Sequence, residues 1–275
     1  MTIAQALAEA ARLGLDRLDA RLLLLHALGR APAERAWLLA HDEQDLSPET
    51  LATFTARCQR RANGEPLAYI VGRKEFFGLD LQVDPRVLVP RPDTETLVEW
   101  ALELLPQSGP ARVIDLGTGS GAIALAITRH RPGAEVEATD LSPAALEVAA
   151  ANAKALALQL VLRQGAWLDA ADGRYDLVVS NPPYVAEDDA HLPALAHEPI
   201  GALAAGPDGL RDIRTIVSQA RHHLRPGGWL LLEHGYDQAA AVRGLLAAQG
   251  FQSVASRRDL SGIERCSGGQ WLELG

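Results

Sequence analysis

From residue 93 onward, apolar residues recur with two different periods, and the two kinds of segment alternate along the chain. Short apolar runs indicate buried strands, which we predict at 112–116, 134–139, 160–163, 175–180, 229–233, 251–256 and 270–274. Longer segments with apolar positions three and four residues apart indicate helices, which we predict at 94–105, 122–131, 143–156, 212–224 and 238–249. Such alternation predicts an α/β domain in which helices cover both faces of a parallel sheet.

The first seventy or so residues show only the helical period. Ser47-Pro48 is typical of a helix start, with serine as the N-cap and proline in the first turn, and Asn63-Gly64 is typical of a helix end. Two stripes are expected to face the core, namely Leu7, Ala11 and Leu15, and then Leu18, Leu22 and Leu25. We therefore predict a small helical domain over residues 1–74.

Residues 75–92 have a different character from the segments on either side. Glu75-Phe76-Phe77 and Leu79-Asp80-Leu81-Gln82-Val83 flank Gly78, which predicts two strands about a glycine turn. Pro90-Arg91-Pro92 then interrupts any regular structure. We interpret residues 75–92 as a β-hairpin linker between the helical domain and a larger domain over residues 93–275.

Charge and composition exclude several classes of protein. The net charge of the 275-residue chain is −9, which argues against a general phosphate-binding surface. Cys58 and Cys266 lie far apart and show no metal-site or redox spacing. The chain begins without a signal-peptide pattern, and no apolar run is long enough to span a bilayer. We expect a soluble, cytoplasmic monomer that binds no metal or membrane and makes no direct contact with nucleic acid.

A glycine-rich turn follows the first predicted strand of the larger domain. Asp115-Leu116-Gly117-Thr118-Gly119-Ser120-Gly121 lets the backbone approach a ligand closely and turn into the next helix. Asp140 ends the second strand, where a carboxylate can accept hydrogen bonds from both ribose hydroxyls. The G-x-G-x-G spacing and the acidic residue before it favour S-adenosylmethionine over NAD. Trp167, in the loop after the third strand, is either an adenine contact or a buried core residue.

Asn181-Pro182-Pro183-Tyr184 follows the predicted strand 175–180, so it lies at the carboxyl edge of the sheet beside the cofactor crevice. The Asn181 carboxamide oxygen and the Pro182 carbonyl can each accept one N–H hydrogen bond from a planar NH₂ group. Proline restrains the backbone, and Tyr184 offers a flat face for stacking. This motif predicts direct methyl transfer to an amide nitrogen or to the exocyclic amine of a base.

These motifs and several others resemble the HemK/PrmC family of peptide chain release factor glutamine methyltransferases, over nearly the whole chain. The further segments that carry the resemblance are Glu65-Pro66-Leu67-Ala68-Tyr69-Ile70-Val71-Gly72, Val89-Pro90-Arg91-Pro92-Asp93-Thr94-Glu95, Glu198-Pro199, Gly206-Pro207-Asp208-Gly209-Leu210, Glu233-His234-Gly235 and Asp259-Leu260-Ser261-Gly262. Two positions depart from the family pattern: Asp93 stands where glutamate is usual, and Ala166 stands where aspartate often precedes the tryptophan.

The resemblance implies a class I S-adenosylmethionine-dependent methyltransferase fold, which is Rossmann-like, after a small helical domain. We expect the helical domain to recognise the substrate, because it is ordered and carries little chemistry. The resemblance implies cofactor contacts from Gly117 to Gly121 and at Asp140, Trp167 and Asn181. It also implies that the substrate glutamine lies against Asn181 to Tyr184. The family's substrate is the glutamine of the Gly-Gly-Gln motif of class I peptide chain release factors. Arg91 either contacts the substrate backbone or pairs with an acidic side chain.

Four other functions stay open at this point. A methyltransferase acting on amino groups of nucleic acids would use the same Asn-Pro-Pro-Tyr motif, although the acidic charge disfavours it. A glutamine methyltransferase of a ribosomal protein would use identical chemistry. An NAD-linked oxidoreductase would need a different glycine spacing and a proton donor. A binding module without turnover would bind the cofactor only.

Overall fold

The computed structural model of the protein describes residues 1–272. The chain forms two compact units, Met1–Arg73 and Lys74–Gly275. The first unit is helical, with α1 (Ile3–Arg12), α2 (Arg17–Ala27), α3 (Arg35–Ala40), α4 (Pro48–Ala62) and α5 (Leu67–Val71). Ser47 caps α4 and Asn63 ends it, which confirms the boundaries predicted for this helix. Within residues 1–272, no helix is long and apolar enough to cross a membrane.

The buried face of the first two helices differs from the predicted stripes. In α1 the buried residues are Ile3, Ala6 and Ala10, whereas Leu7 is only partly buried and Ala11 is exposed. In α2 Leu18 is 46% exposed. The prediction was therefore wrong for Ala11 and Leu18, whereas Leu25 is buried and Leu7 and Leu15 pack against the core cluster.

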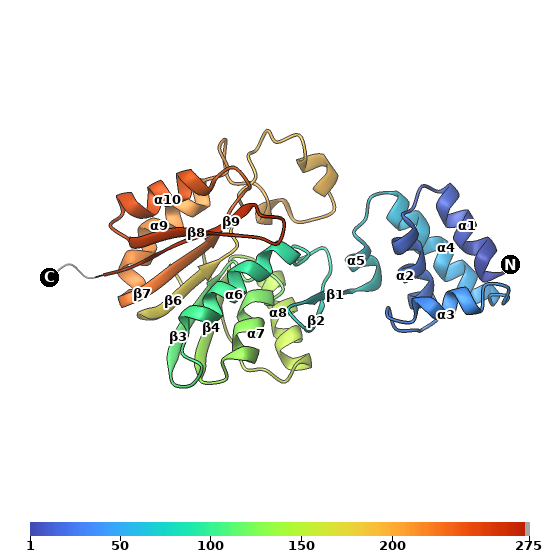
Figure 1. The fold of residues 1–275 in the computed structure, drawn as a ribbon, viewed down its shortest axis with the longest axis horizontal. Coiled ribbons are helices and arrows are strands. Elements are labelled where there is room, and N and C mark those ends of the chain that lie inside the picture. Colours follow the sequence, from blue (N-terminus) through green and yellow to red (C-terminus); the bar gives the residue numbers. More distant parts are fainter. Residues whose placement is uncertain (273–275) are drawn as a thin grey trace. The chain divides into compact units, whose positions relative to one another are not determined.

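The second unit is built on a seven-stranded sheet with the order β5-β4-β3-β6-β7-β9-β8. Its elements are β1 (Arg73–Phe76), β2 (Leu79–Gln82), η1 (Pro92–Thr94), α6 (Glu95–Leu104), β3 (Ala111–Leu116), α7 (Ala122–His130), β4 (Ala134–Asp140), α8 (Pro143–Ala155), β5 (Val161–Gln164), β6 (Tyr175–Ser180), η2 (Leu192–Leu195), η3 (Ile200–Ala202), α9 (Arg211–His223), β7 (Leu224–Glu233), α10 (Ala239–Ala248), β8 (Gln252–Arg258) and β9 (Glu264–Gln270). Figure 1 shows α6, α7 and α8 on one face of this sheet and α9 and α10 on the other.

The central strands are apolar on both faces, as strands covered by helices on each side require. Residues 113 to 116 of β3 and residues 177 to 180 of β6 are all buried. These strands lie parallel and side by side, with Leu116 paired to Ser180. The predicted strand–helix alternation and the layered α/β fold are therefore confirmed.

One strand differs from the prediction in position and direction. The last strand is β9 at Glu264–Gln270, and it runs antiparallel to both β7 and β8, so the sheet is mixed. We predicted a strand at 270–274 in a parallel sheet; residues 273–274 lie outside the described residues. Gly268 and Gly269 leave no apolar pattern in the sequence, yet both are buried where a Cβ would collide with Leu231 and Phe251.

The predicted hairpin forms from β1 and β2, and its contacts make it part of the second unit. Phe76, Leu79 and Leu81 are buried in the same apolar cluster as α6 and α7. The Gln82 backbone N–H donates to Asn152 Oδ1 at 2.7 Å, and Asn152 Nδ2 donates back to the Gln82 carbonyl at 3.0 Å. Asn152 also donates to the Ser120 carbonyl at 2.9 Å, so one buried side chain joins the hairpin to the glycine-rich turn.

Candidate active site

The carboxyl ends of β3 and β6 bring the two principal motifs together. The Ser180 hydroxyl donates to the Leu116 carbonyl at 2.7 Å, immediately before the glycine-rich turn and the Asn181–Tyr184 motif. A change of connection direction between neighbouring parallel strands leaves a crevice at this edge, and ligands of α/β proteins bind there. The two motifs therefore begin at the same level of the sheet, on either side of that crevice.

A cavity of about 480 Å³ opens at this edge. Nine of the residues singled out from the sequence line it, namely Arg91, Gly117, Thr118, Gly119, Ser120, Asp140, Trp167, Asn181 and Pro183. The remaining four, Asp115, Gly121, Pro182 and Tyr184, are not among the residues that line it. Residues from the hairpin connection and from the loop after β6 complete the wall, including Leu88, Pro90 and Pro199.

The glycine-rich turn has left-handed backbone at its three glycines, with φ of +68° at Gly117, +55° at Gly119 and +83° at Gly121. A Cβ on Gly117 would lie 3.1 Å from the Trp167 ring, so glycine is needed for the close approach of that ring. A Cβ on Gly119 would meet no protein atom within 4 Å, so this backbone faces open space. The Gly119 N–H donates to Asp140 Oδ2 at 2.9 Å, which fixes the carboxylate at the rim of the cavity.

Asp115 is a fully buried carboxyl group behind the turn. Its Oδ2 accepts hydrogen bonds from the Thr118 hydroxyl at 2.7 Å and from the Ala124 N–H at 3.3 Å. Its Oδ1 is buried and has no hydrogen-bond partner among residues 1–272. Burial raises the Asp115 pKa to about 7, although the Thr118 and Ala124 hydrogen bonds oppose the shift. An unpaired oxygen of this kind is suited to a cationic donor from a ligand.

Trp167 lies in the loop between β5 and β6. The sequence left open whether it contacts adenine or is a buried core residue. Its ring lines the cavity beside Gly117 and also packs against the apolar cluster under α9. Its backbone is left-handed, with φ of +49°, and its carbonyl accepts a hydrogen bond from the Thr139 hydroxyl at 3.0 Å. A bulky residue in this conformation is strained, so the surrounding loop must hold it in place.

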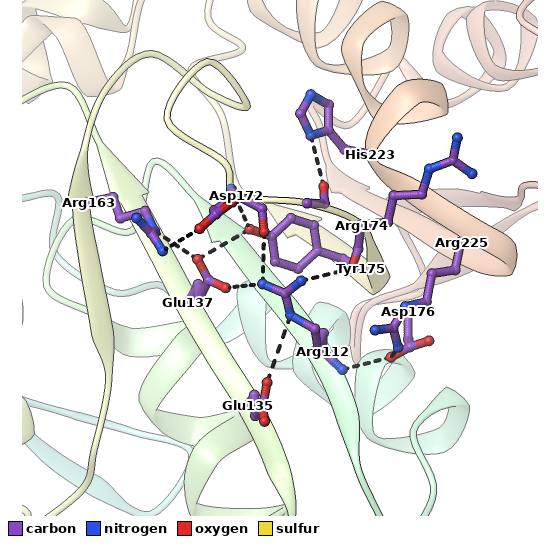
Figure 2. A network of polar contacts seen from close by, with 11 residues as sticks. Arg112, Glu135, Glu137, Arg163, Asp172, Arg174, Tyr175, Asp176, His223 and Arg225 are labelled. Atoms are coloured by element: carbon purple, nitrogen blue, oxygen red, sulfur yellow. Dashed lines mark hydrogen bonds and ion pairs between the residues drawn. The ribbon is translucent and has the colours of Figure 1, made fainter.

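A polar network fastens the far end of that loop to the sheet (Figure 2). Glu137 of β4 accepts hydrogen bonds from Arg112 at 2.6 Å and from Arg163 at 2.9 Å. The Tyr175 hydroxyl also donates to Glu137, at 3.2 Å, and accepts the Asp172 N–H at 3.1 Å. Arg112 donates to the Asp172 carbonyl at 2.9 Å. The buried Glu137 carboxylate thus connects residues of β3, β5 and β6. Two of these residues, Arg112 and Tyr175, also bond to Asp172 in the loop that carries Trp167.

We expect Glu137→Gln to lower the free energy of unfolding by about 2–3 kcal/mol at neutral pH, because both arginines lose a charged acceptor. Burial raises the pKa of Glu137, but the hydrogen bonds from Arg163 and Arg112 outweigh it, and the pKa lies below its usual 4.5. A lowered folded-state pKa adds stability that is present above 4.5 and lost as the pH falls through the folded-state pKa. Urea unfolding from pH 7 to pH 3 measures both effects.

Glu135→Gln is the matched control, since Glu135 lies on the same strand, is 77% exposed and approaches Arg112 only to 3.8 Å. It should change stability by less than about 0.5 kcal/mol. The Glu137 variant should also bind cofactor more weakly, through the looser Trp167 loop. Equal stability of the two variants across this pH range contradicts the role given to Glu137.

Hydrogen bonds orient the Asn181–Tyr184 motif. Asn181 Nδ2 donates to Thr94 Oγ1 at 3.2 Å, which leaves Asn181 Oδ1 as an acceptor. Pro182 and Pro183 are buried. The Tyr184 hydroxyl donates to Glu233 Oε1 at 3.2 Å, and burial raises the Tyr184 pKa well above its usual value.

Arg91 pairs with an acidic side chain. Its guanidinium forms an ion pair with Glu198, whose Oε2 also accepts the Val89 N–H at 3.1 Å. Glu198 is buried. Its contacts with Arg91 and Val89 join the loop after β6 to the segment before η1. Sequence reasoning assigned no role to Thr94, Glu198 or Glu233, although each falls within a segment that carries the family resemblance. That resemblance was the only signal that could have pointed to them.

Two family models match the chain. The PrmC N-terminal domain matches residues 2–72, and the methyltransferase small domain matches residues 94–205. The release factor glutamine methyltransferase of Bordetella pertussis is 52% identical over 260 residues, which is 93% of this chain and 95% of that protein. The chain belongs to the release factor glutamine methyltransferase family.

Solved methyltransferases have the same fold as this family member. A methyltransferase from Pyrococcus furiosus aligns with a TM-score of 0.57 and 21% identity, over 79% of this chain and 99% of that one. The 16S rRNA N2 G1207 methyltransferase of T. thermophilus, solved with AdoMet and guanosine, aligns with a TM-score of 0.54 and 22% identity. The alignment covers 72% of this chain and 49% of that one. At these identities the likeness establishes the class I methyltransferase fold, and the predicted fold class is confirmed.

Proposed function

We propose that the protein transfers a methyl group from S-adenosylmethionine to the side-chain amide nitrogen of the glutamine in the Gly-Gly-Gln motif of class I peptide chain release factors. The observation that carries the proposal is the oriented Asn181 carboxamide beside a glycine-lined cavity. The chain is also about half identical to a release factor glutamine methyltransferase over nearly its full length.

The residues at the cavity fit S-adenosylmethionine. Asp140 stands at the rim for the ribose hydroxyls, and the open backbone at Gly119 allows close approach. Asp115 Oδ1, buried and without a partner in the described chain, suits the positively charged amino group of the methionine part. Trp167 offers a flat ring toward the adenine. When bound, this cofactor supplies an electrophilic methyl group on a sulfonium sulfur.

The chain's own residues position the acceptor nitrogen. An amide nitrogen is a weak nucleophile because its lone pair is delocalised into the carbonyl. Asn181 Oδ1 and the Pro182 carbonyl each accept one N–H of the substrate amide, which directs the nitrogen lone pair at the methyl group. With the cofactor bound, the nitrogen would form a bond to the methyl carbon as the bond from that carbon to sulfur breaks, with the electron pair left on sulfur as a neutral thioether, and the nitrogen would afterwards release one proton to water. Such positioning alone can supply several kcal/mol of the barrier reduction, about 7–11 in favourable intramolecular cases.

Methyl transfer from labelled S-adenosylmethionine to a purified class I release factor tests the proposal. A release factor with the target glutamine changed to alanine serves as the control substrate. Label on the first substrate and none on the second supports both the reaction and the site. No label on either, with cofactor binding intact, contradicts the proposal, and a ribosomal-protein glutamine becomes the next substrate to assay.

We further propose that the helical unit recognises the release factor, because it forms a separate core and carries none of the cavity residues. Deleting residues 1–74 should leave the cofactor dissociation constant within about twofold and raise KM for the release factor by about tenfold or more, equivalent to about 1.4 kcal/mol of binding. Isothermal titration and steady-state kinetics measure the two quantities. Unchanged KM contradicts the recognition role.

A further inference from the structure

A buried glutamic acid lies directly behind the Asn181–Tyr184 motif. Glu233 is the last residue of β7 and is 1% exposed. Its Oε1 accepts the Tyr184 hydroxyl at 3.2 Å. Its Oε2 is buried and forms no hydrogen bond that meets ordinary geometry with any residue from 1 to 272. A carboxyl group in this position costs stability, so packing alone does not account for it.

Thr94 holds the other end of the motif and also influences the charge of Glu233. Thr94 is 4% exposed, and its hydroxyl is the acceptor for Asn181 Nδ2 at 3.2 Å. The same hydroxyl lowers the pKa of Glu233, as a donor directed at a carboxylate does. The Tyr184 hydroxyl therefore bonds directly to the Glu233 carboxyl group, whereas Thr94 bonds to Asn181 and acts on the pKa of Glu233.

The charge state of Glu233 decides how strongly its carboxyl group holds the Tyr184 hydroxyl. Burial raises the Glu233 pKa to about 7, while Thr94, Tyr184 and Arg265 oppose the shift and Asp93 adds to it. Arg265 is itself held between Asp93 at 3.3 Å and Asp259 at 3.4 Å. The titratable and charged groups that face Glu233 are Asp93 from η1, Tyr184 from the turn after β6, and Arg265 and Cys266 from β9.

We propose that Glu233 is a positioning residue for methyl transfer: its buried carboxylate holds the Tyr184 hydroxyl and so fixes the Tyr184 ring of the Asn181–Tyr184 motif for the substrate amide. The inference rests on the function proposed above. An ionised carboxylate is a strong acceptor for the Tyr184 hydroxyl, whereas protonation removes the charge and weakens that hydrogen bond. The Tyr184 ring, which ends the Asn181–Tyr184 motif, would then be held less firmly.

Glu233→Gln tests this role because it keeps the shape and removes the charge. We expect kcat to fall by about 10- to 100-fold, since misplacement of an acceptor by a fraction of an ångström has effects of this size. The dissociation constant of S-adenosylmethionine and KM for the release factor should stay within about twofold, because the loss is confined to the transition state. In wild type kcat should rise with pH through about 7, and this step should be missing in the variant.

Ser267→Ala is the control for a change in buried packing on the same strands. Ser267 is fully buried and bonds to His234 Nε2 at 2.8 Å and to Ser256 at 2.7 Å. This variant should lower the melting temperature and leave kcat and its pH profile unchanged. Tyr184→Phe should cost less in a Glu233→Gln background than it does alone, because both changes weaken the same hydrogen bond.

Wild type, Glu233→Gln and Ser267→Ala are assayed together, so the two proposals fail differently. A wild-type enzyme without activity on the release factor overturns the proposed function and this inference with it. An active wild type with kcat unchanged in Glu233→Gln, or with the pH step retained there, overturns the inference alone. If Glu233→Gln does not fold, Tyr184→Phe removes the same hydrogen bond from its other end, and unchanged kcat in that variant overturns the inference.

Discussion

Asn181→Ala should reduce methyl transfer to the release factor by about 10²- to 10³-fold, the usual effect of removing one oriented hydrogen-bonding group from a reacting centre. The alanine removes the Oδ1 acceptor for the substrate amide and also the donor to Thr94. The substrate nitrogen then keeps only the Pro182 carbonyl, and one of its N–H bonds is free to rotate out of line. Transition-state positioning is lost, so the effect should appear mainly in kcat.

The affinity for S-adenosylmethionine provides the control within the same variant. Gly117, Gly119 and Asp140 are untouched by the change, so the cofactor dissociation constant should shift by less than about threefold, or about 0.7 kcal/mol. Titration calorimetry measures it, and single-turnover kinetics measures the transfer step. Transfer within tenfold of wild type would show that another group orients the acceptor. A parallel loss of cofactor affinity would instead assign Asn181 chiefly to the cofactor.

Gly209→Ala should destabilise the second unit by about 3–4 kcal/mol, the sum of a left-handed residue and an overpacked contact. Gly209 has φ of +68°, and a Cβ there would lie 2.2 Å from the Tyr184 carbonyl oxygen and 2.7 Å from Gln238 Nε2. Gln238 Nε2 donates to that same carbonyl at 3.0 Å. The added methyl group must therefore displace the backbone of the Asn181–Tyr184 motif or break its support.

Gly206→Ala is the matched control for the backbone conformation. Gly206 has φ of +78°, and a Cβ there would meet only Arg211 Cβ, at an ordinary 3.4 Å. This variant should cost only the conformational part, about 1–2 kcal/mol. Urea unfolding gives both values, and kcat measured well below the melting temperature should fall in Gly209→Ala only. Equal destabilisation by Gly209→Ala and Gly206→Ala would contradict the collision with the Tyr184 carbonyl.

Local patterns in the sequence were sufficient to predict most elements and the position of the principal motifs. The Ser47 and Ser142 caps and the apolar runs of β3 and β6 report interactions within a few residues, so the sequence contains the whole signal. The glycine-rich turn and the Asn181–Tyr184 motif each follow a strand. Because parallel strands end at the same edge of a sheet, the sequence also predicted that these two motifs lie together.

Contacts between distant segments were decided only by the tertiary structure. Thr94 and Glu233 are polar residues at the ends of elements, and a sequence pattern assigns such residues to the surface, yet both are buried against Asn181 and Tyr184. Gly268 and Gly269 carry no side chain that could mark a strand, and their place in β9 follows from the close packing of Leu231 and Phe251. Burial of polar groups and glycines depends on what the rest of the chain places over them, and no local period records it.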